Sequence, residues 1–250
     1  MKIIDAVWEK RNLGVETVEF VIENSDTEVV ITEIFEAEKQ YNVVKLPTNK
    51  PKLMTLLQEN GYHFVECMLH VTHDLSENKV AAAKRLRMFE STCQPMNDSD
   101  LKELFVELEK GMFITDRIYN DAHFSKEAAE VRYKNWLIDE YEKGSIIYKS
   151  IFRGKTIGFF VLKRMKNDVF YPFLAALYND YIDRGFGISM SVNILSECIN
   201  QGAKQVSTYI SSNNLAIIRV DVLLGYSING IFYVFVKHKQ QDFIKGEINA

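Results

Sequence analysis

The N-terminal part of the chain alternates between apolar and polar residues over short stretches, which is typical of strands with one buried face. The alternation predicts strands over residues 18–23, 29–31, 41–46 and 64–71. Pro51 suits the first turn of a helix because its ring fixes a helical backbone angle, and Gly61 suits the residue after the helix end. We therefore expect strands and at least one helix in this part of the chain.

The stretch over residues 75–100 is polar and rich in turn-forming residues. Such stretches commonly connect domains. We place the domain boundary here, with an N-terminal domain over residues 1–95 and a C-terminal domain over residues 96–250. Asp100 and Glu103 have the spacing of a capping box, which predicts that a short helix begins at this point.

The second half shows a regular succession of strand and helix patterns. Apolar stretches predict strands over residues 113–118, 146–152, 157–162, 170–177, 206–210 and 231–236. Helical spacing of apolar residues predicts helices that begin near Ser125, Gly187 and Asn214. This order predicts an α+β or α/β fold with a mixed sheet flanked by helices. The N-terminal part is then a smaller α/β domain.

Composition and charge narrow the class of protein. The chain has 250 residues, 47% hydrophobic and 26% charged, which predicts a large buried core and argues against disorder. The net charge of −4 argues against a nucleic-acid partner. No apolar run approaches the length of a membrane span, and charges close to Met1 argue against a signal peptide. The three cysteines form no C-x-x-C pair, so we expect a reducing, cytoplasmic location and no membrane partner.

The stretch from Phe173 to Ile188 is the most informative part of the sequence. A strand pattern runs into a short loop with Gly185 and Gly187, and a helix pattern follows at once. The first turn of a helix has unpaired N–H groups, and glycines let the backbone approach a phosphate closely, so the loop is a candidate anion site. A turn that uses glycine only for its backbone angles gives the same pattern. The dinucleotide fingerprint G-x-G-x-x-G is incomplete, because Met190 occupies the third glycine position.

This loop resembles the one that follows the fourth strand in the GNAT acetyltransferase superfamily. In that family a Q/R-x-x-G-x-G/A segment holds the diphosphate of coenzyme A through backbone amides. The corresponding residues here are Ile182, Asp183, Arg184, Gly185, Phe186 and Gly187. Ile182 departs from the family pattern, but the backbone amides do most of the binding at this place.

A second segment supports the resemblance. Asn214, followed eleven residues later by Gly225 and Tyr226, is similar to the family's N-x-x-A-x-x-x-Y-x-x-x-G-F segment. Ile217 stands in place of alanine, and Asp221 stands in place of tyrosine. The second departure matters more, because that tyrosine often protonates the departing thiolate in the family.

The resemblance implies a GNAT fold and an acetyl-CoA-dependent N-acetyltransferase that transfers acetyl directly to a primary amine. It also implies coenzyme contacts along the strand end, the loop, the helix start and the asparagine: Ala176, Leu177, Ile182, Asp183, Arg184, Gly185, Phe186, Gly187, Ile188 and Asn214. We expect the sheet to split beside Leu177, and the amides of residues 182–188 to converge on the diphosphate. No metal-ligand pattern such as H-E-x-x-H occurs, so we expect no metal.

The proton donor is placed at Asp221 or Tyr226, and Tyr233 is a further tyrosine candidate. Asp221 has the family position, but a carboxyl has a pKa of about 4 unless burial raises it, and a solvent-facing or capping carboxylate is the alternative. The Tyr226 phenol has an ordinary pKa of about 10, which suits a thiolate, and core packing is the alternative. Asp116 and His123 are candidates on the side of the acceptor amine, although lone residues of this kind are more often structural.

A closer resemblance covers most of the chain. Residues 121–125, 132–133, 136–137 and 157–160 are similar to the dTDP-fucosamine acetyltransferases, whose smaller GNAT-like N-terminal domain has no coenzyme site of its own. This resemblance implies a small-molecule amine, a nucleotide-linked amino sugar, as the acceptor. A polyamine, an antibiotic or a protein amine stays open. So do a homodimer and a catalytically degenerate GNAT pair that only binds partners.

Overall fold

The computed structural model describes residues 1–239, which form two compact units. The first contains residues 1–65 and the C-terminal stretch from Phe232, and the second contains residues 66–231. The boundary expected between residues 95 and 96 falls inside the second unit. The division into GNAT-like domains over residues 1–95 and 96–250 therefore stays a prediction about relatedness rather than a description of these units.

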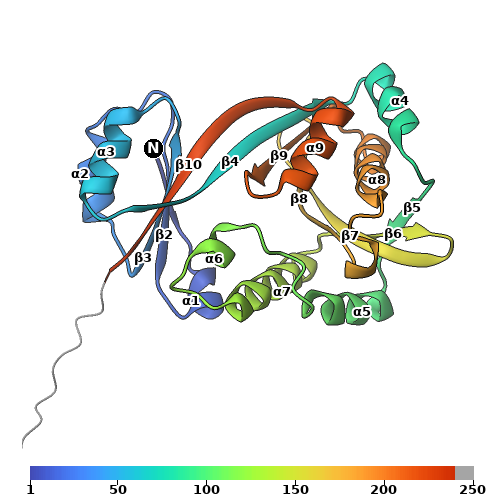
Figure 1. Ribbon diagram of the computed structural model, residues 1–250, viewed down its shortest axis with the longest axis horizontal. Coiled ribbons are helices and arrows are strands. Elements are labelled where there is room, and N and C mark those ends of the chain that lie inside the picture. The colour runs from blue at the N-terminus through green and yellow to red at the C-terminus, as the bar shows by residue number, and fades with distance from the viewer. Residues whose placement is uncertain (240–250) are drawn as a thin grey trace, which may run out of the picture. The chain divides into compact units, whose positions relative to one another are not determined.

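The first unit is a four-stranded mixed sheet with helices (Figure 1). The first and second strands are antiparallel, the second and third are parallel, and the third pairs in antiparallel fashion with the C-terminal strand. Its core gathers apolar side chains from the strands and from α2 and α3. The elements are β1 (Lys2–Asp5), α1 (Trp8–Leu13), β2 (Thr17–Val21), α2 (Val30–Glu36), β3 (Tyr41–Pro47), α3 (Pro51–Glu59) and the later part of β10 (Ser227–His238).

The second unit contains a sheet with the strand order β4-β9-β8-β7-β6-β5. All neighbours in it are antiparallel except β8 and β9, which are parallel. The strand predicted over residues 170–177 thus lies inside the sheet. The strands are β4 (His63–Asp74), β5 (Thr92–Pro95), β6 (Ile147–Phe152), β7 (Lys155–Arg164), β8 (Val169–Leu177) and β9 (Gln205–Ser211).

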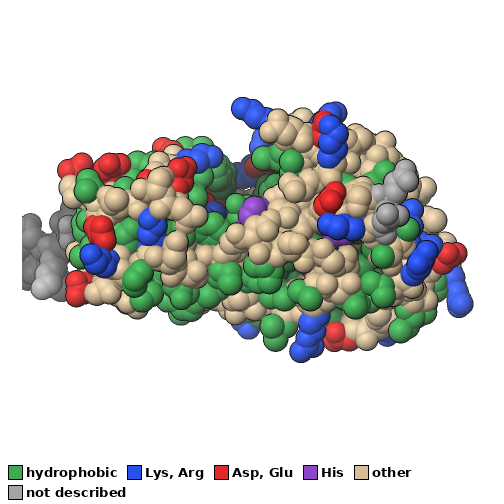
Figure 2. Space-filling view, turned by 90° about the horizontal axis from the view of Figure 1, so that it is seen from above, with side chains coloured by type: hydrophobic (Ala, Val, Ile, Leu, Met, Phe, Trp, Pro, Cys, Tyr) green, Lys and Arg blue, Asp and Glu red, His purple; other side chains and the backbone are tan. Residues whose placement is uncertain are grey.

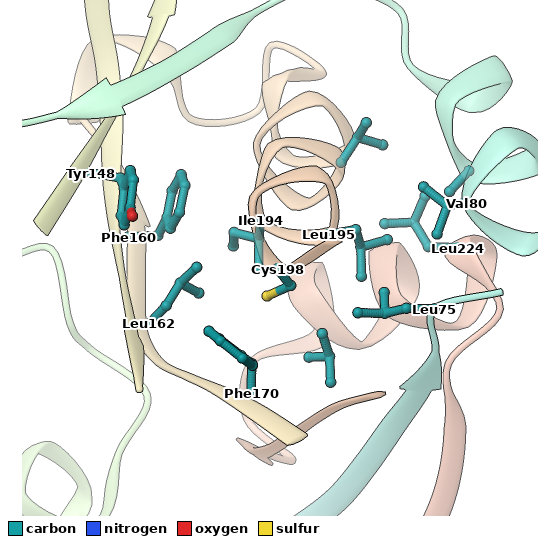
Figure 3. Packing of buried hydrophobic residues seen from close by; sticks show 13 residues of the cluster. Leu75, Val80, Tyr148, Phe160, Leu162, Phe170, Ile194, Leu195, Cys198 and Leu224 are labelled. Atoms are coloured by element: carbon teal, nitrogen blue, oxygen red, sulfur yellow. The ribbon is translucent and has the colours of Figure 1, made fainter. Parts of the chain in front are cut away.

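Helices cover both faces of this sheet (Figure 1). On one face α4, α8 and α9 enclose an apolar core around Phe160, Phe170 and Leu195 (Figure 3). On the other face α5 and α7 pack over Phe159 and Val161. The helices are α4 (Glu77–Leu86), α5 (Asp98–Leu108), α6 (Arg117–Asn120), α7 (Lys126–Glu142), α8 (Phe186–Asn200) and α9 (Leu215–Leu224), with a short 3-10 turn at Asn179–Tyr181.

Two expectations about elements were wrong. The β-branched run over residues 29–31 predicted a strand, but α2 begins there, and Val30 and Ile34, one helical turn apart, are both buried. The stretch 113–118 forms no strand, because Asp116 caps α6 instead. The polar stretch 75–100, where the domain boundary was placed, contains α4 and β5. Because β5 replaces the missing strand in the count, β8 is still the fourth strand after residue 90.

Capping residues explain several helix ends. Ser125 accepts a hydrogen bond from the Ala128 N–H at 3.2 Å, as the sequence suggested for α7. For α5 the capping box is formed by Asn97 and Asp100, three residues before the expected one. Gly225 ends α9 in the left-handed region at φ 89°, a conformation that glycine adopts without strain.

The outer surface mixes charges of both signs. Figure 2 shows lysine and arginine side chains interspersed with aspartate and glutamate over one face of the molecule. Among residues 1–239, no helix combines the length and apolarity that a membrane crossing requires.

Candidate functional site

The parallel strands β8 and β9 separate soon after they begin. Within the described residues they pair only at Val169–Gln205 and Phe170–Val206. The Thr208 hydroxyl then donates to the Pro172 carbonyl at 3.0 Å. Beyond this point β8 continues to pair with β7 as far as Leu177 on its other edge. The edge of β8 that faces β9 is therefore open from about residue 174, and this is the split that the sequence led us to expect beside Leu177.

The backbone of β8 presents amides to this gap. The Tyr178 N–H donates to the Ile157 carbonyl at 2.9 Å, so position 178 bonds toward β7. Because bonding direction alternates along an antiparallel strand, Ala176 also bonds toward β7, whereas Ala175 and Leu177 point their backbone groups to the gap. A register shift in β8 next to Leu174 sets this alternation. Of the two residues predicted to meet the coenzyme, Leu177 directs its amide into the gap and Ala176 does not.

Gly158 of β7 lets the end of β8 take this position. A β-carbon on residue 158 would lie 2.9 Å from the Leu177 Cα and would collide with the Ala176 carbonyl oxygen. Real β-carbons do not approach backbone so closely, so any other residue would displace β8. This role of Gly158 was not predicted from the sequence, where residues 157–160 stood out only through their resemblance to known enzymes.

The loop after β8 brings the predicted coenzyme residues to the start of α8. Asp183 and Gly185 have positive φ angles of 59° and 83°, and Gly185 is the N-cap of α8. Gly185 has no side chain to cap the first turn, so this turn leaves N–H groups for an anion at the positive end of the helix. The structure thus places residues 182–188 as the motif predicts, while their contact with a diphosphate stays a prediction.

A cavity of about 600 Å³ opens beside this loop. It contains three cationic side chains, from the β6–β7 turn and from the loop, and one carboxylate. Its lining residues are Phe152, Arg153, Lys155, Asp180, Tyr181, Arg184 and Phe186. The Arg153 guanidinium lies over the Phe152 ring, 5.1 Å from its centroid. The sequence singled out Arg184 and Phe186 but missed Arg153 and Lys155, whose place next to the loop depends on hairpin geometry.

A segment from between α4 and β5 packs against the same loop. The Phe89 ring stacks on the Phe186 ring with their centroids 4.6 Å apart. The Ser189 hydroxyl donates a hydrogen bond of 2.6 Å to the Phe89 carbonyl. A β-carbon on Gly185 would lie 3.3 Å from the Met88 sulfur. These side chains cover part of the loop, and the cavity opens beside Arg184 and Phe186.

Asn214 caps its own helix. Its Oδ1 accepts a hydrogen bond from the Ile217 N–H at 3.2 Å. The sequence left a cap and a coenzyme contact open together. The structure shows the first, and the second stays a prediction.

Asp221 is buried in an apolar recess. It is 5% exposed, and the side chains around it come from β4, β9, α9 and the start of β10, including Leu69, Ile210 and Tyr226. Removal from water raises the pKa of Asp221 to about 7. The solvent-facing alternative for this carboxyl is therefore wrong. The recess borders the β4 side of β9, whereas the gap opens on its β8 side.

Tyr226 lies in the core beside this recess. Its ring packs on His73 at 4.9 Å, and burial together with the Asp221 carboxylate raises the pKa of Tyr226 well above its ordinary value. His73 is itself buried, its Nε2 lies 3.1 Å from the Leu224 carbonyl, and burial lowers the pKa of its imidazole. These contacts favour the packing role that the sequence offered as the alternative for Tyr226.

Asp116 has structural partners. Its Oδ1 accepts from the Tyr119 N–H at 3.0 Å, and its Oδ2 accepts from the Tyr133 hydroxyl at 2.7 Å. The Arg132 guanidinium is 3.7 Å away. His123 is 62% exposed at its side chain and its Nδ1 lies 3.2 Å from Asp121. Asp116 thus joins α6 to α7, which favours the structural alternative for this residue.

The fold is shared with known structures. A GCN5-related N-acetyltransferase from Sphaerobacter thermophilus matches 95% of this chain and 75% of its own, with a TM-score of 0.63 and 9% identity. The chain has the GNAT acetyltransferase fold. A functionally unknown conserved protein from Staphylococcus epidermidis ATCC 12228 matches 90% of this chain and 85% of its own, with a TM-score of 0.59 and 12% identity.

A tandem GNAT protein from the clavulanic acid biosynthesis pathway shares the GNAT fold as well. It matches 90% of this chain and 76% of its own, with a TM-score of 0.57 and 11% identity. These structural matches confirm the expected fold class. Neither a protein-family model nor a curated protein sequence matches the chain. At identities of 9–12% these matches support the fold alone, and the reaction has to be inferred from the site.

Proposed function

We propose that this protein is an acetyl-CoA-dependent N-acetyltransferase that transfers acetyl directly to a primary amine. The observation that carries the proposal is the gap between β8 and β9, which opens next to the uncapped first turn of α8. Such a gap gives an extended thioester a path along a free strand edge. The helix start beside it offers N–H groups to a diphosphate.

The residues around the loop fit coenzyme A. Bound there, acetyl-CoA supplies an activated acetyl group as a thioester. The amides of residues 182–188 would hold the diphosphate, and Arg184 with Arg153 and Lys155 would offset the remaining phosphate charge. Leu177 would bond the pantetheine arm through the backbone groups that it directs into the gap. Ala176 and Asn214 also belong to the proposed contact set, although the backbone of Ala176 faces β7 and Asn214 caps α9.

The chemistry needs a neutral amine, a polarised carbonyl and a proton for the thiolate. The amine nitrogen forms a bond to the carbonyl carbon, the carbon–sulfur bond breaks, and the proton lost by the amine balances the one that the thiolate gains. The N–H groups that face the gap would polarise the carbonyl. Asp221 is the proposed proton donor, because a carboxyl with a pKa of about 7 keeps much of its proton at neutral pH. Tyr226 is the second candidate.

The resemblance to dTDP-fucosamine acetyltransferases supports an amino sugar, nucleotide-linked, as the acceptor. The cysteine pattern supports a cytoplasmic location, and a homodimer is left open. One observation favours a different function, a GNAT pair that binds partners without turnover. Asp221 replaces the family's tyrosine and lies in a recess with apolar walls.

Titration calorimetry with coenzyme A, followed by a thiol-release assay with acetyl-CoA and an amine panel, tests the proposal. We expect binding, and turnover with at least one amine. The double variant Arg153→Gln/Arg184→Gln should weaken coenzyme binding by about tenfold and reduce its salt dependence. Lys52→Gln, which removes an exposed cation of the first unit, is the control and should bind as the wild type does.

Two results discriminate further. Binding without turnover on any amine favours the partner-binding alternative. Absence of coenzyme binding removes both GNAT functions.

A further inference from the structure

The strands β4 and β9 present a polar face on the side of the sheet opposite α9. Leu69, Val71 and Ile210 pack with side chains of α9, so the alternate residues of both strands point the other way. The pairs on this second face are Met68–Ser211, His70–Tyr209 and Thr72–Ser207. These central pairs are uncharged, and the charged positions of this face on β4, Glu66 and Asp74, lie at its ends.

An aromatic pair stands at the centre of this face. The rings of His70 and Tyr209 stack with centroids 4.8 Å apart and planes at 25°. The His70 Nε2 and the Ser207 hydroxyl lie 2.8 Å apart, which fixes the imidazole. Tyr209 is 46% exposed although it lies on an interior strand. Beside them, Asn229 donates to the Thr72 hydroxyl at 2.6 Å. The face thus combines an accessible ring with several groups that both donate and accept hydrogen bonds.

This face borders the gap. The last contact between β8 and β9 uses Thr208, and Tyr209 is the next residue of β9. Burial raises the pKa of the Tyr171 phenol to about 12, and the nearby Tyr209 phenol adds to this rise. The ring centroids of Tyr171 and Phe173 are 6.0 Å apart, and those of Phe173 and Trp136 of α7 are 5.2 Å apart. An amine held over Tyr209 would meet an acetyl group that enters the gap from the face of α8 and α9.

We propose that His70, Ser207, Tyr209 and Tyr171 form the binding surface for the acceptor, and that the acceptor is an amino sugar or a similarly hydroxylated amine. This rests on the proposed function. A sugar offers C–H groups to an aromatic ring and hydroxyls to Ser, Thr, Asn and His side chains. A polyamine instead needs several carboxylates along its length, and the three central pairs supply none. Tyr209 positions the amine, and His70 holds the Tyr209 ring in place by stacking on it.

The proposed acceptor surface is tested by measuring the binding of glucosamine with saturation-transfer NMR, in the presence of saturating coenzyme A. Spermidine is the competing probe. We expect glucosamine to bind the wild type and Tyr209→Ala to weaken that binding by about tenfold. Tyr209→Phe, which keeps the ring, should weaken it less, and His70→Asn should weaken it as well. Coenzyme affinity should stay unchanged in all three variants.

Tyr141→Ala is the matched control, because Tyr141 of α7 is a tyrosine of similar exposure, 43%, that lies outside this face. It should leave glucosamine binding unchanged. The proposal is overturned if the wild type with bound coenzyme does not bind glucosamine, if spermidine binds in its place, or if Tyr209→Ala and His70→Asn bind as the wild type does. Circular dichroism shows whether each variant is folded. If Tyr209→Ala does not fold, the comparison is made with Tyr209→Phe and His70→Asn. If the wild type does not bind coenzyme at all, the proposed function itself is wrong. This result is distinct from failure of the acceptor surface, in which coenzyme binds and glucosamine does not.

Discussion

Each unit contains a parallel strand–helix–strand crossover, and the two crossovers differ in how far their strands stay together. In the first, β2 and β3 pair over five aligned positions, from Thr17–Tyr41 to Val21–Lys45. In the second, β8 and β9 pair at only two. The connection differs as well. The residue before α2, Val29, has helical angles, whereas α8 starts from a left-handed Gly185.

The comparison shows what turns a common supersecondary unit into a candidate site. Where two strands pair along their whole length, the backbone groups on their facing edges bond to each other, and the side chains of β2 and β3 contribute to a core. Early separation leaves one edge of β8 with amides for a ligand, next to a helix start that carries positive charge.

The largest expected effect comes from closing or displacing the open edge. Gly158→Ala puts a β-carbon against the backbone of Ala176 and Leu177, so β8 must move. We expect a loss of about 100-fold in acetyl transfer, because displacement of a positioned group by about 1 Å has effects of that size. The free energy of unfolding should fall by about 1–3 kcal/mol. Steady-state kinetics and chemical denaturation measure the two.

Gly202→Ala is the control for this change. Gly202 has φ 81° and open space around it, so alanine costs backbone strain there without touching the site. Its stability should fall while its kinetics stay those of the wild type. Equal losses of activity in both variants would show that the position of β8 is not what matters.

A smaller effect is expected at the start of α8. Leucine at position 187 would extend into the space next to Val220 and obstruct the approach of a diphosphate to the first turn, so coenzyme binding should weaken by about tenfold. Gly187→Ala is the matched variant, since its β-carbon makes an ordinary contact of 3.5 Å with Val220. It should bind coenzyme nearly as the wild type does and unfold at a slightly higher temperature. Calorimetry on both variants decides, and tight binding by Gly187→Leu contradicts the proposed diphosphate site.

The smallest effect concerns Asp221 and depends on pH. Its carboxyl has an ordinary pKa of 3.8, and burial raises it to about 7 in the folded protein. Between these values the unfolded chain releases the proton while the folded chain keeps it, so this group lowers stability as pH rises from 4 to 7. Asp221→Asn removes that effect. The variant should melt with the wild type near pH 4 and at a higher temperature than the wild type at pH 8, where the wild-type carboxyl must be ionised in its apolar recess.

Thermal melts across this range measure it. Parallel pH profiles of the wild type and variant would contradict the placement of the carboxyl in an apolar recess.

The sequence was sufficient for local features with a strong pattern. The hairpin around Gly154, the helix that begins after Gly185 and the helix from Asn214 to Gly225 are where the pattern placed them. It failed where tertiary packing outweighs local preference. The run at residues 29–31 is β-branched, yet its apolar residues satisfy a helical period against the core.

For the site, the loop was predictable because it is continuous in sequence. Arg153, Lys155, Gly158 and Tyr209 were not, because only the pairing of β7 with β8 and of β9 with β4 brings them to it.

The pairing of β4 with β9 also bears on how this protein can be divided in the laboratory. The two strands are joined over seven positions, from Met68–Ser211 to Asp74–Gln205. A truncated chain that starts at residue 96 would lose β4 and expose the full edge of β9, and it would also strip α4 and β5 from α8. Exposed strand edges favour self-association, so expression of such a fragment should yield aggregates rather than a smaller folded protein.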